Sequence, residues 1–497
     1  MGVIIRQSIK GTIVNYIGSF IGFLTTMFVV TKFLKPEEFG LTVVIYEAAA
    51  LIAMFSQLGT SASAMRFFPY FKDPQNNNNG FFFYLLLLPA IGALIFIPFY
   101  LFLKTPIIAY FSQNASSFGD YYYWVIPLSF FCLYWGVFET YSTLQMRIVV
   151  PKLIREVGVR VFLLAVYLLF AFGFLNLTGL VRGVIIVYAM AMFLTLAYVI
   201  HIAPTSLKHD FSYINKPLRR KLWNYTLFLV LGSLSGSILP QLDLFMVGSQ
   251  MGLGYAGIYR VAFYIAVIIE IPYRSLSSIS SPMASRLLKD GDWKAANKLY
   301  QKVALHQLIA GSSIFTLVWI NIDNIFSIIP NGDIYALGKW VVFYLALSRI
   351  IATTLSFGGV LVSFSKYYYW GLFFSVFITI IGIITNLLLI PQLGITGAAI
   401  ASLITSFLSY LVQQWVVITK IKGNPYTVSL IRQIFLTILL LIINFVLPQW
   451  AENPFIDGIY RTIIISSLAI ALLYKFRISD DLCMAIDNFL LKKKHSN

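Results

Sequence analysis

The segment that decides the fold runs from Trp223 to Asp290 and reads WNYTLFLVLGSLSGSILPQLDLFMVGSQMGLGYAGIYRVAFYIAVIIEIPYRSLSSISSPMASRLLKD. Two long apolar runs flank a glycine-rich turn, GSQMGLGYAG. Each run is long enough to cross a bilayer, because a spanning helix needs about 20 residues. The segment therefore predicts two transmembrane helices joined by a tight turn.

Four ionisable side chains lie inside these apolar runs: Asp243, Arg260, Glu270 and Arg274. A charge at the bilayer centre costs roughly 2.5–3.5 kcal/mol on insertion scales, so such residues usually face a cavity or a partner. Because the turn is short, we expect Asp243 and Arg260 to lie at similar depth and to interact. Glu270 and Arg274 are spaced i, i+4 with the acid first, which suits an ion pair. Arg260 and Arg274 lie about 40° apart around the helix and roughly 21 Å apart along it, so one helix face carries positive charge at two depths.

The whole chain has the composition of an integral membrane protein. Of its 497 residues, 59% are hydrophobic and only 11% are charged, and the mean hydropathy is +0.82. Soluble domains carry roughly 25% charged residues. The apolar runs are too long for the alternating strands of an outer-membrane barrel, which measure about 10 residues. We therefore predict an all-α integral membrane protein.

About fourteen transmembrane helices are predicted. The first apolar run is too long for the core of a signal peptide, so it is interpreted as a retained span. Most lysines and arginines fall on one side of this arrangement, which predicts that both termini are cytoplasmic. The net charge of +17 is thus a topology signal, and no polar domain is predicted that would bind nucleic acid. The predicted spans are 12–34, 41–64, 81–103, 121–145, 152–175, 180–203, 222–247, 255–281, 301–323, 336–363, 367–390, 394–418, 430–448 and 458–476.

The chain contains an internal repeat. Phe39-Gly40 aligns with Ala256-Gly257, and an ungapped offset then carries Lys72-Asp73 onto Lys289-Asp290. Six helices in each unit mean that both units enter the membrane in the same direction. This is a parallel repeat, a construction that is frequent in transporters.

The repeat sets the predicted domain organisation. Gly18 and Gly22 recur as Gly232 and Gly236, and this small-residue spacing allows two helices to approach closely. The last two predicted helices fall outside the repeat. We predict two parallel six-helix bundles and a C-terminal extension of two transmembrane helices with a cytoplasmic tail, over residues 1–215, 216–425 and 426–497.

Enzymatic and cofactor chemistry find no support in the sequence. The stretch from Gly332 to Trp340 is a near miss for a phosphate-binding loop, because it has one residue too many and Trp340 replaces the needed Ser or Thr. The four histidines are scattered and the two cysteines lie far apart, so no metal site, disulfide or cofactor is predicted. We therefore expect a transport protein that is not an enzyme.

Other charged side chains lie within predicted spans, namely Glu47, Glu139, Arg160 and Arg349. Glu156 and Arg160 are again spaced i, i+4. Such charges either form structural ion pairs between helices or line a cavity, and the sequence leaves both interpretations open. Arg349 has no partner close in sequence, so we expect it to be free to bind a ligand.

The candidate site follows from these charges and from the repeated Asn15 and Asn224. Coupling to H⁺ or Na⁺ stays open: Glu270 lies closest to mid-membrane, but the neighbouring Arg274 would keep it ionised. The candidate residues that line the substrate cavity are Arg260, Arg274, Arg349, Arg160, Asn15 and Asn224. The candidate coupling or ion-pair residues are Glu47, Glu139, Asp243 and Glu270.

Several motifs resemble those of one transporter family. They are KFLKPEEFG at 32–40, QLDLFMVG at 241–248, AGIYRVA at 256–262, Ser281-Pro282 before Lys289–Asp292, and NLLLIPQLGITGAA at 386–399. They are similar to the motifs of polysaccharide-unit flippases of the Wzx (O-antigen) type, in the MATE-like multidrug/oligosaccharidyl-lipid/polysaccharide superfamily.

The resemblance covers nearly the whole chain and implies a fold and a substrate. The implied fold is two six-helix bundles around a central cavity, with two extra C-terminal helices and alternating access. The implied substrate is an undecaprenyl-diphosphate-linked oligosaccharide, flipped across the bacterial inner membrane among its lipids.

Two other functions compete with this interpretation. A cation-coupled multidrug exporter of the MATE type would bind cationic, aromatic substrates and should show cavity acids without arginines. The intramembrane arginines favour an anionic substrate instead. A membrane-embedded glycan polymerase or ligase would carry large external loops, whereas the external loops predicted here are short.

The predicted topology can be tested by cysteine labelling. A cysteine introduced at Gln250 should react with an impermeant maleimide added outside the cell, because the turn that contains it is predicted to be external. A cysteine at Lys494 should react only after the cells are permeabilised. The opposite pattern would reject the topology.

Overall fold

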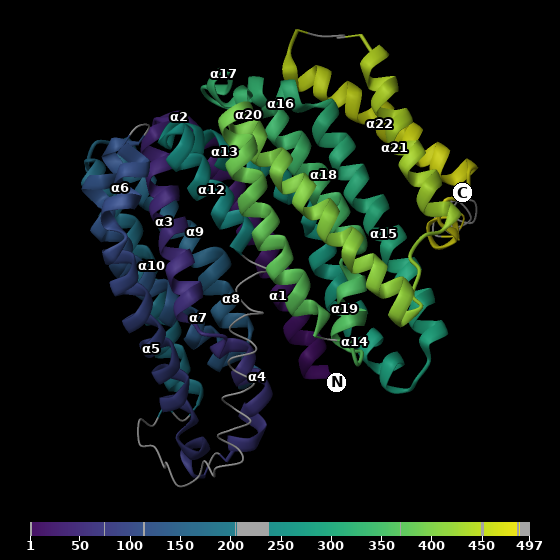
Figure 1. The fold of residues 1–497 in the computed structure, drawn as a ribbon. Helices are drawn as coiled ribbons and strands as arrows, with labels where there is room; N and C mark the ends of the chain where they lie inside the picture. Colours follow the sequence, from purple (N-terminus) through teal and green to yellow (C-terminus); the bar gives the residue numbers. More distant parts are fainter. Residues whose placement is uncertain are drawn as a thin grey trace, which may run out of the picture. The chain divides into compact units, whose positions relative to one another are not determined.

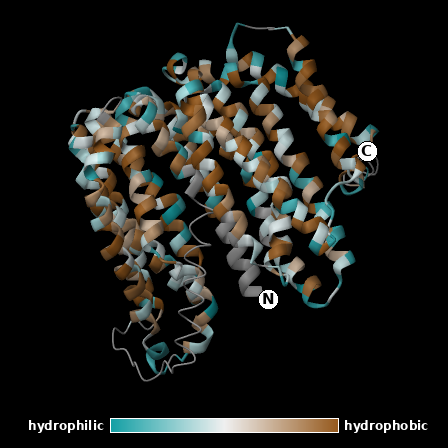
Figure 2. Ribbon diagram, in the orientation of Figure 1, coloured by the Kyte–Doolittle hydropathy of each residue, from teal (hydrophilic) through white to brown (hydrophobic). Residues whose placement is uncertain are grey.

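The computed structural model describes residues 2–73, 75–112, 115–203, 205, 238–367, 369–448, 452–484 and 487. These residues form helices and connecting turns, and no strand occurs among them (Figure 1). Hydrophobic residues predominate along many of the helices, and hydrophilic residues are frequent in the connecting turns (Figure 2). The predicted all-α fold is confirmed.

The contacts between residues divide the chain into two compact units. The first is Met1–Val261 with Leu372–Ala401, and the second is Ala262–Gly371 with Ser402–Asn497. The division passes through two helices, α13 (Leu253–Val267) and α20 (Trp370–Val416). The predicted bundles end instead near residues 215 and 425, where the repeat ends. Those bounds stay a prediction, because compactness does not test which segments are related by a repeat.

The first unit contains α13 up to Val261, residues Leu372–Ala401 of α20 and the helices that precede α13. A π-helical turn, η1 (Thr25–Val30), follows α1, and another, η4 (Ile154–Gly158), joins α8 to α9. The α-helices before α13 are α1 (Gly2–Leu24), α2 (Thr31–Phe33), α3 (Pro36–Ser56), α4 (Thr60–Phe71), α5 (Phe81–Phe102), α6 (Lys104–Ser112), α7 (Val125–Leu144), α8 (Val149–Leu153), α9 (Val159–Ala171), α10 (Leu177–Ile202) and α12 (Ile238–Met251).

The second unit is organised around α15 (Trp293–Ile320), which contacts α14 (Ile271–Lys289), α18 (Lys339–Leu355) and α21 (Val428–Val446). Buried aliphatic side chains from α15, α21 and α22 (Pro454–Lys475) form one cluster, so the two C-terminal helices pack on α15. The remaining helices are α16 (Ile322–Ile328), α17 (Gly332–Tyr335) and α19 (Phe357–Ser363).

Eleven helices in the described part of the chain are long and apolar enough to cross a membrane. The predicted span 152–175 is not one of them, and four charged residues lie at its start, namely Lys152, Arg155, Glu156 and Arg160. Most of the predicted span 222–247 lies outside the described residues. The number fourteen therefore stays a prediction. The eleven spans are Ile13–Phe33, Pro36–Phe71, Gln75–Phe102, Ser116–Leu144, Leu177–Ile202, Leu253–Arg274, Trp293–Ile320, Gly332–Leu355, Val376–Ile421, Val428–Val446 and Pro454–Lys475.

The long helix α20 is two helical segments that meet at Gly394. This glycine has φ 62° and ψ −143°, a conformation that is open to glycine and strained for other residues. Pro391, one turn earlier, removes a backbone hydrogen-bond donor from the helix. The predicted spans 367–390 and 394–418 correspond to the segments on either side of this break.

Two glycines related by the repeat meet where α3 crosses α13. A Cβ atom built on Gly40 would lie 1.8 Å from the carbonyl oxygen of Leu253, and one built on Gly257 would lie 2.3 Å from that of Pro36. The offset that pairs Gly40 with Gly257 also pairs Pro36 with Leu253. Gly40 thus meets Leu253, while Gly257 meets Pro36, the residue that the repeat pairs with Leu253. Such reciprocal contacts are typical of elements related by a two-fold axis. The contact supports the parallel repeat.

This crossing yields a stability prediction. Replacing Gly40 by Ala should lower the free energy of unfolding by about 1–3 kcal/mol, because the new methyl group cannot fit against the backbone of Leu253. Thermal unfolding in detergent would measure the loss.

Gly371 provides the control, since a Cβ atom there would meet nothing within 4 Å. Replacing Gly371 by Ala should leave the melting temperature unchanged or raise it, because alanine favours helix. Equal melting temperatures for the Gly40 variant and the parent protein would contradict the close approach.

Candidate functional site

The first unit holds an ion pair between α3 and α13. An Nη1 donor of Arg260 lies 2.8 Å from Oε1 of Glu47, whose side chain is 3% exposed. The glycine crossing brings the two helices close enough for this contact. The pair therefore links two predicted site residues that lie far apart in the sequence.

Asp243 on α12 has a different partner. The side-chain amide of Asn386, on α20, donates a hydrogen bond of 2.8 Å to Oδ1 of Asp243, and both side chains are buried. The contacts seen for Asp243 and for Arg260 thus go to Asn386 and to Glu47. The direct contact between Asp243 and Arg260 that the sequence suggested stays a prediction.

Two further ion pairs lie in the first unit. The predicted pair of Glu156 and Arg160 is confirmed, with an N–O distance of 3.0 Å. Glu139 on α7 contacts Arg155, at 2.9 Å, and the guanidinium of Arg155 also lies 5.7 Å from the ring of Trp135. Sequence analysis missed Arg155, although its position one residue before Glu156 at the start of an apolar run was a usable signal.

The helix α1 packs closely against the segment that carries Arg160. A Cβ atom on Gly18 would lie 2.1 Å from the carbonyl oxygen of Glu156, and one on Gly22 would lie 3.1 Å from Cδ of Arg160. The predicted role of this glycine pair is confirmed. Asn15, one turn earlier on α1, is partly buried, whereas Asn224 lies outside the described residues.

The second unit holds a cluster of three charged side chains, Glu270, Arg274 and Arg349, which we call the Glu270 cluster. Oε1 of Glu270 lies 2.7 Å from Nη1 of Arg349, and Oε2 lies 3.8 Å from Nη2 of Arg274. The predicted pair of Glu270 and Arg274 is therefore confirmed, but at a distance too long for a hydrogen bond. The single carboxylate of Glu270 thus forms ion pairs with the guanidinium groups of both Arg349 and Arg274.

The backbone places Glu270 at a break between helices. Residues Ile268–Glu270 form a 3₁₀ turn, η5, between α13 and α14. Pro272 stands just after this turn and has no N–H for a helical hydrogen bond. Short 3₁₀ stretches within helices often mark functional hinges. The carboxylate that holds both arginines thus lies where the helix can bend.

The prediction that Arg349 is free of a protein partner is wrong, because Glu270 on another helix pairs with it. Its guanidinium also lies 5.2 Å from the ring of Phe263. However, Nε of Arg349 is buried and has no hydrogen-bond partner in the described part of the chain. An unsatisfied buried donor is costly, so this atom is available to an acceptor on a ligand or to water.

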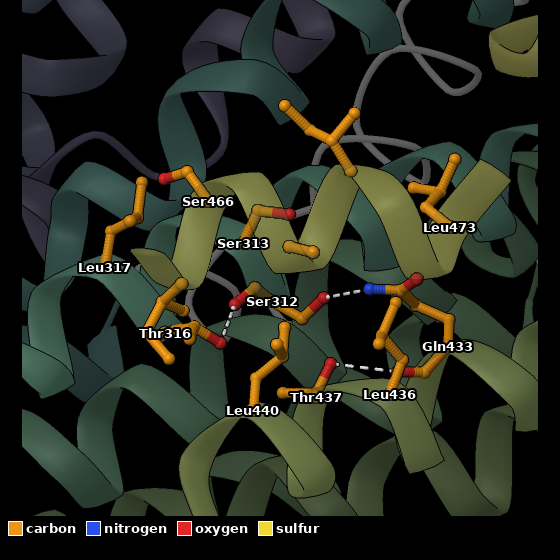
Figure 3. Close-up of a pocket in the computed structure, with 13 residues that line it drawn as sticks. Ser312, Ser313, Thr316, Leu317, Gln433, Leu436, Thr437, Leu440, Ser466 and Leu473 are labelled. Carbon is orange, nitrogen blue, oxygen red and sulfur yellow. Dashed lines mark hydrogen bonds between the residues drawn. The ribbon is translucent and has the colours of Figure 1, made fainter. Parts of the chain in front are cut away.

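A cavity of about 230 Å³ lies among α15, α21 and α22 of the second unit. Figure 3 shows Gln433 pointing toward Ser312, and its amide donates a hydrogen bond of 2.9 Å to the serine hydroxyl. Small hydroxyl and aliphatic side chains form the other walls. None of the described residues that line the cavity is charged, so these residues do not suit a diphosphate, in contrast to the Glu270 cluster.

A buried polar network at α22 also escaped sequence analysis. Asp457 accepts hydrogen bonds from Arg461 at 2.7 Å and from Asn324 at 2.8 Å. Arg461 in turn donates to the side-chain oxygen of Asn444 at 2.9 Å. The i, i+4 spacing of Asp457 and Arg461 was the available signal. The network joins α16, α21 and α22. Its members satisfy one another with hydrogen bonds, so we interpret its role as structural.

No group of three or more His, Cys, Asp or Glu residues that could hold a metal ion occurs among the described residues. Arginine can bind a phosphate through two parallel hydrogen bonds, and its charge persists at all physiological pH values.

Known proteins that are similar to this chain in sequence or in fold include a polysaccharide biosynthesis family and membrane transporters. The sequence model of a family described as "Polysaccharide biosynthesis protein" matches residues 5–288. An uncharacterized membrane protein of Methanocaldococcus jannaschii is 29% identical over 211 residues, which make up 40% of this chain and 40% of that relative. The chain thus matches less than half the length of that curated relative.

Solved structures show the same fold at low sequence identity. Lipid II flippase MurJ in an inward closed conformation has a TM-score of 0.73 and 14% identity, over 95% of this chain and 100% of that chain. An inward-facing multidrug resistance MATE family transporter of the MOP superfamily has a TM-score of 0.59 and 13% identity, over 82% and 96%. The predicted MATE-like membrane fold is confirmed, and because the family match covers more than half of its length, the chain belongs to the polysaccharide biosynthesis protein family.

Proposed function

We propose that the protein is a flippase for undecaprenyl-diphosphate-linked oligosaccharides in the bacterial inner membrane. The observation that carries the proposal is the Glu270 cluster, in which two guanidinium groups share one carboxylate inside an apolar unit. The family description and the fold shared with a lipid II flippase support it. The lipid-linked unit would pass from the cytoplasmic to the external leaflet by alternating access.

The diphosphate is the group that makes this movement difficult. It carries negative charge across about 30 Å of hydrocarbon, whereas the polyprenyl tail can stay in lipid. The Glu270 cluster has a formal charge of +1 and therefore attracts an anion. Arg349 offers its unpaired Nε, and Arg274, whose side chain is 45% exposed, can turn toward a ligand. Phosphate oxygens can replace the carboxylate as acceptors.

Glu270 also provides a means of release. In the empty protein its carboxylate orders both arginines and compensates part of their charge. When the diphosphate binds, the carboxylate competes with it for the same donors, so neither partner holds the guanidinium groups too tightly. A transporter needs moderate affinity, because a site that binds too tightly would not release its substrate.

The ion pair of the first unit gives a second place for the anion. Arg260 is 19% exposed, while its partner Glu47 is nearly fully buried. We infer that Arg260 contacts the substrate and that Glu47 holds it in position. Arg160, paired with Glu156 beside α1, has a buried Nη1 without a partner in the described residues and is a third candidate.

The proposal includes the predicted topology, with both termini in the cytoplasm and lysine and arginine in the cytoplasmic segments. Our candidate acids for coupling to H⁺ or Na⁺ are Glu47, Glu139, Asp243 and Glu270, and Asp243 accepts a hydrogen bond from the amide of Asn386.

The second candidate function is a cation-coupled multidrug exporter, which the MATE transporters of similar fold suggest. An exporter of cationic drugs would need acids in its cavity and would gain nothing from the two arginines of the Glu270 cluster. Efflux of a cationic dye and flipping of a polyprenyl diphosphate therefore separate the two functions when both are measured in the same proteoliposomes.

Arginine 349 provides the central test of the flippase. Replacing Arg349 by Ala should slow flipping at least roughly tenfold, because a hydrogen bond to a charged group contributes about 1.5–3 kcal/mol. Replacing it by Lys should restore only part of the rate, since the ammonium keeps the charge but loses the planar fork. A fluorescent polyprenyl-diphosphate oligosaccharide in proteoliposomes, bleached from outside by dithionite, gives the rate.

Arg432, an exposed arginine on α21, is the matched control, and its Ala variant should flip at the parental rate. A parental rate for the Arg349 to Ala variant, at equal amounts of folded protein, would remove Arg349 from substrate handling. A variant that fails only because it does not fold would assign the residue a structural role.

Exchanging the charges of Glu47 and Arg260 tests whether this ion pair only stabilises the protein or whether Arg260 also binds substrate. Replacing Glu47 by Arg or Arg260 by Glu alone should destabilise the protein, because each places like charges in contact. The double variant restores the pair in reverse, so the folded protein should return. If Arg260 binds substrate, flipping should stay roughly tenfold low. Full recovery of flipping would show that the pair is only structural.

A further inference from the structure

Four lysines surround a hollow of about 640 Å³ in the second unit. Lys294 lies in the first turn of α15, Lys366 lies between α19 and α20, and Lys420 lies in the π-helical turn η7 (Val417–Ile421). Lys422 follows this turn directly. No carboxylate lines the hollow among the described residues. Three segments that are distant in sequence thus bring four positive charges together.

These lysines are exposed and hold no acidic partner among the residues that the structure describes. The acid closest to them in sequence is Asp292, which is already engaged as the N-cap of α15, accepting a hydrogen bond of 2.9 Å from the backbone N–H of Ala295. Like charges repel one another when nothing neutralises them. An anionic group in the hollow would relieve this repulsion.

The hollow lies at the ends of membrane spans. The span of α15 begins at Trp293, and the span that contains α20 ends at Ile421, and both residues line the hollow. Trp293 and Phe364 are exposed apolar rings on its wall, and Tyr367 completes the aromatic set. Aromatic side chains of this kind gather where a membrane meets water. A ligand here has access to both the headgroup region and solvent.

The backbone of the hollow is fixed by specific contacts. Lys422 has φ 60° and ψ 26°, a left-handed conformation in which helices usually end with glycine. The next segment is tied to α15, because the side-chain oxygen of Asn297 accepts from the N–H of Asn424 at 2.7 Å and Gln301 donates to the carbonyl oxygen of Asn424 at 3.0 Å. A lysine therefore occupies a position where glycine would fit without strain.

We propose that this lysine hollow binds the phosphate-bearing headgroup of an anionic membrane lipid. Basic pockets at the membrane surface between helices bind such headgroups. The lysines would contact the phosphate, and the aromatic rings would lie against the glycerol and upper acyl region. A lipid fits better than a soluble anion, because a soluble anion would make no use of these rings. The site consists of other residues than the Glu270 cluster and goes beyond the proposed transport.

Native mass spectrometry of the detergent-purified protein tests the proposal. The probes are dioctanoyl phosphatidylglycerol and, for comparison, the zwitterionic dioctanoyl phosphatidylcholine. Replacing Lys294, Lys366, Lys420 and Lys422 together by Gln should weaken phosphatidylglycerol binding roughly tenfold or more, since each lysine near an anionic headgroup contributes to affinity. Phosphatidylcholine should bind weakly to both proteins.

A second quadruple variant controls for net charge. Lys72, Lys289, Lys298 and Lys475 are exposed lysines outside the hollow, and their replacement by Gln removes the same charge. This variant should bind phosphatidylglycerol as the parent does. An equal loss in both quadruple variants would overturn the proposal, because the binding would then reflect overall charge.

Lys422 allows a test that does not depend on folding. Replacing Lys422 by Gly removes one charge and relieves the left-handed backbone, so the melting temperature should stay the same or rise while lipid affinity falls several-fold. Unchanged affinity in this variant, together with an unaffected quadruple variant, would refute the site.

Two further measurements are informative. One distinguishes a lipid headgroup from a soluble anion, and the other distinguishes the lipid site from the proposed flippase site. Inorganic diphosphate should compete weakly, and competition as strong as that of phosphatidylglycerol would replace the lipid by a soluble anion. The Arg349 to Ala variant should bind phosphatidylglycerol as the parent does. The lipid site is thus decided by binding alone, even if the flipping assay gives no transport.

Discussion

The close crossing of α3 and α13 is the constraint on which the first unit depends. Neither Gly40 nor Gly257 has room for a single Cβ atom, because each meets the backbone of the other helix. This approach places Arg260 within 2.8 Å of the buried Glu47, so that a charge that would be costly in an apolar setting is compensated. The contact is reciprocal, because the same sequence offset relates the two glycines and the two residues whose backbone they meet.

Sequence periodicity and composition were sufficient for the class of fold and for the contacts that are local along a helix. The pairs of Glu156 with Arg160 and of Glu270 with Arg274 follow from i, i+4 spacing, and both exist. The partner of Arg349 could not be read in the same way, since Glu270 lies 79 residues away and only tertiary packing joins them. The same reason hid Asn386 as the partner of Asp243, because an amide within an apolar run carries no signal of what it will face.

The polar groups of the second unit differ in how completely their charges and hydrogen bonds are satisfied. In the network of Asp457 and Arg461, hydrogen bonds from α16, α21 and α22 satisfy the charges, as a structural network requires. The Glu270 cluster leaves a buried donor of Arg349 unsatisfied. Among the residues that the structure describes, no carboxylate lines the hollow that holds the four lysines. The unsatisfied donor of Arg349 and the lysines of the hollow are cationic, and the ligands that we propose for both sites bear phosphate.

The unequal ratio of charges in the Glu270 cluster also has an electrical consequence. Its two guanidinium groups and one carboxylate leave one net elementary charge, whereas the charges of Glu47 and Arg260 cancel. A membrane potential acts on a net charge with about 2.3 kcal/mol for every 100 mV that the charge crosses. Any bending at the turn beside Glu270 that changes the depth of the cluster is therefore sensitive to voltage. A bound diphosphate would reverse the sign of that charge, so the empty and the loaded protein would respond to the same potential in opposite directions.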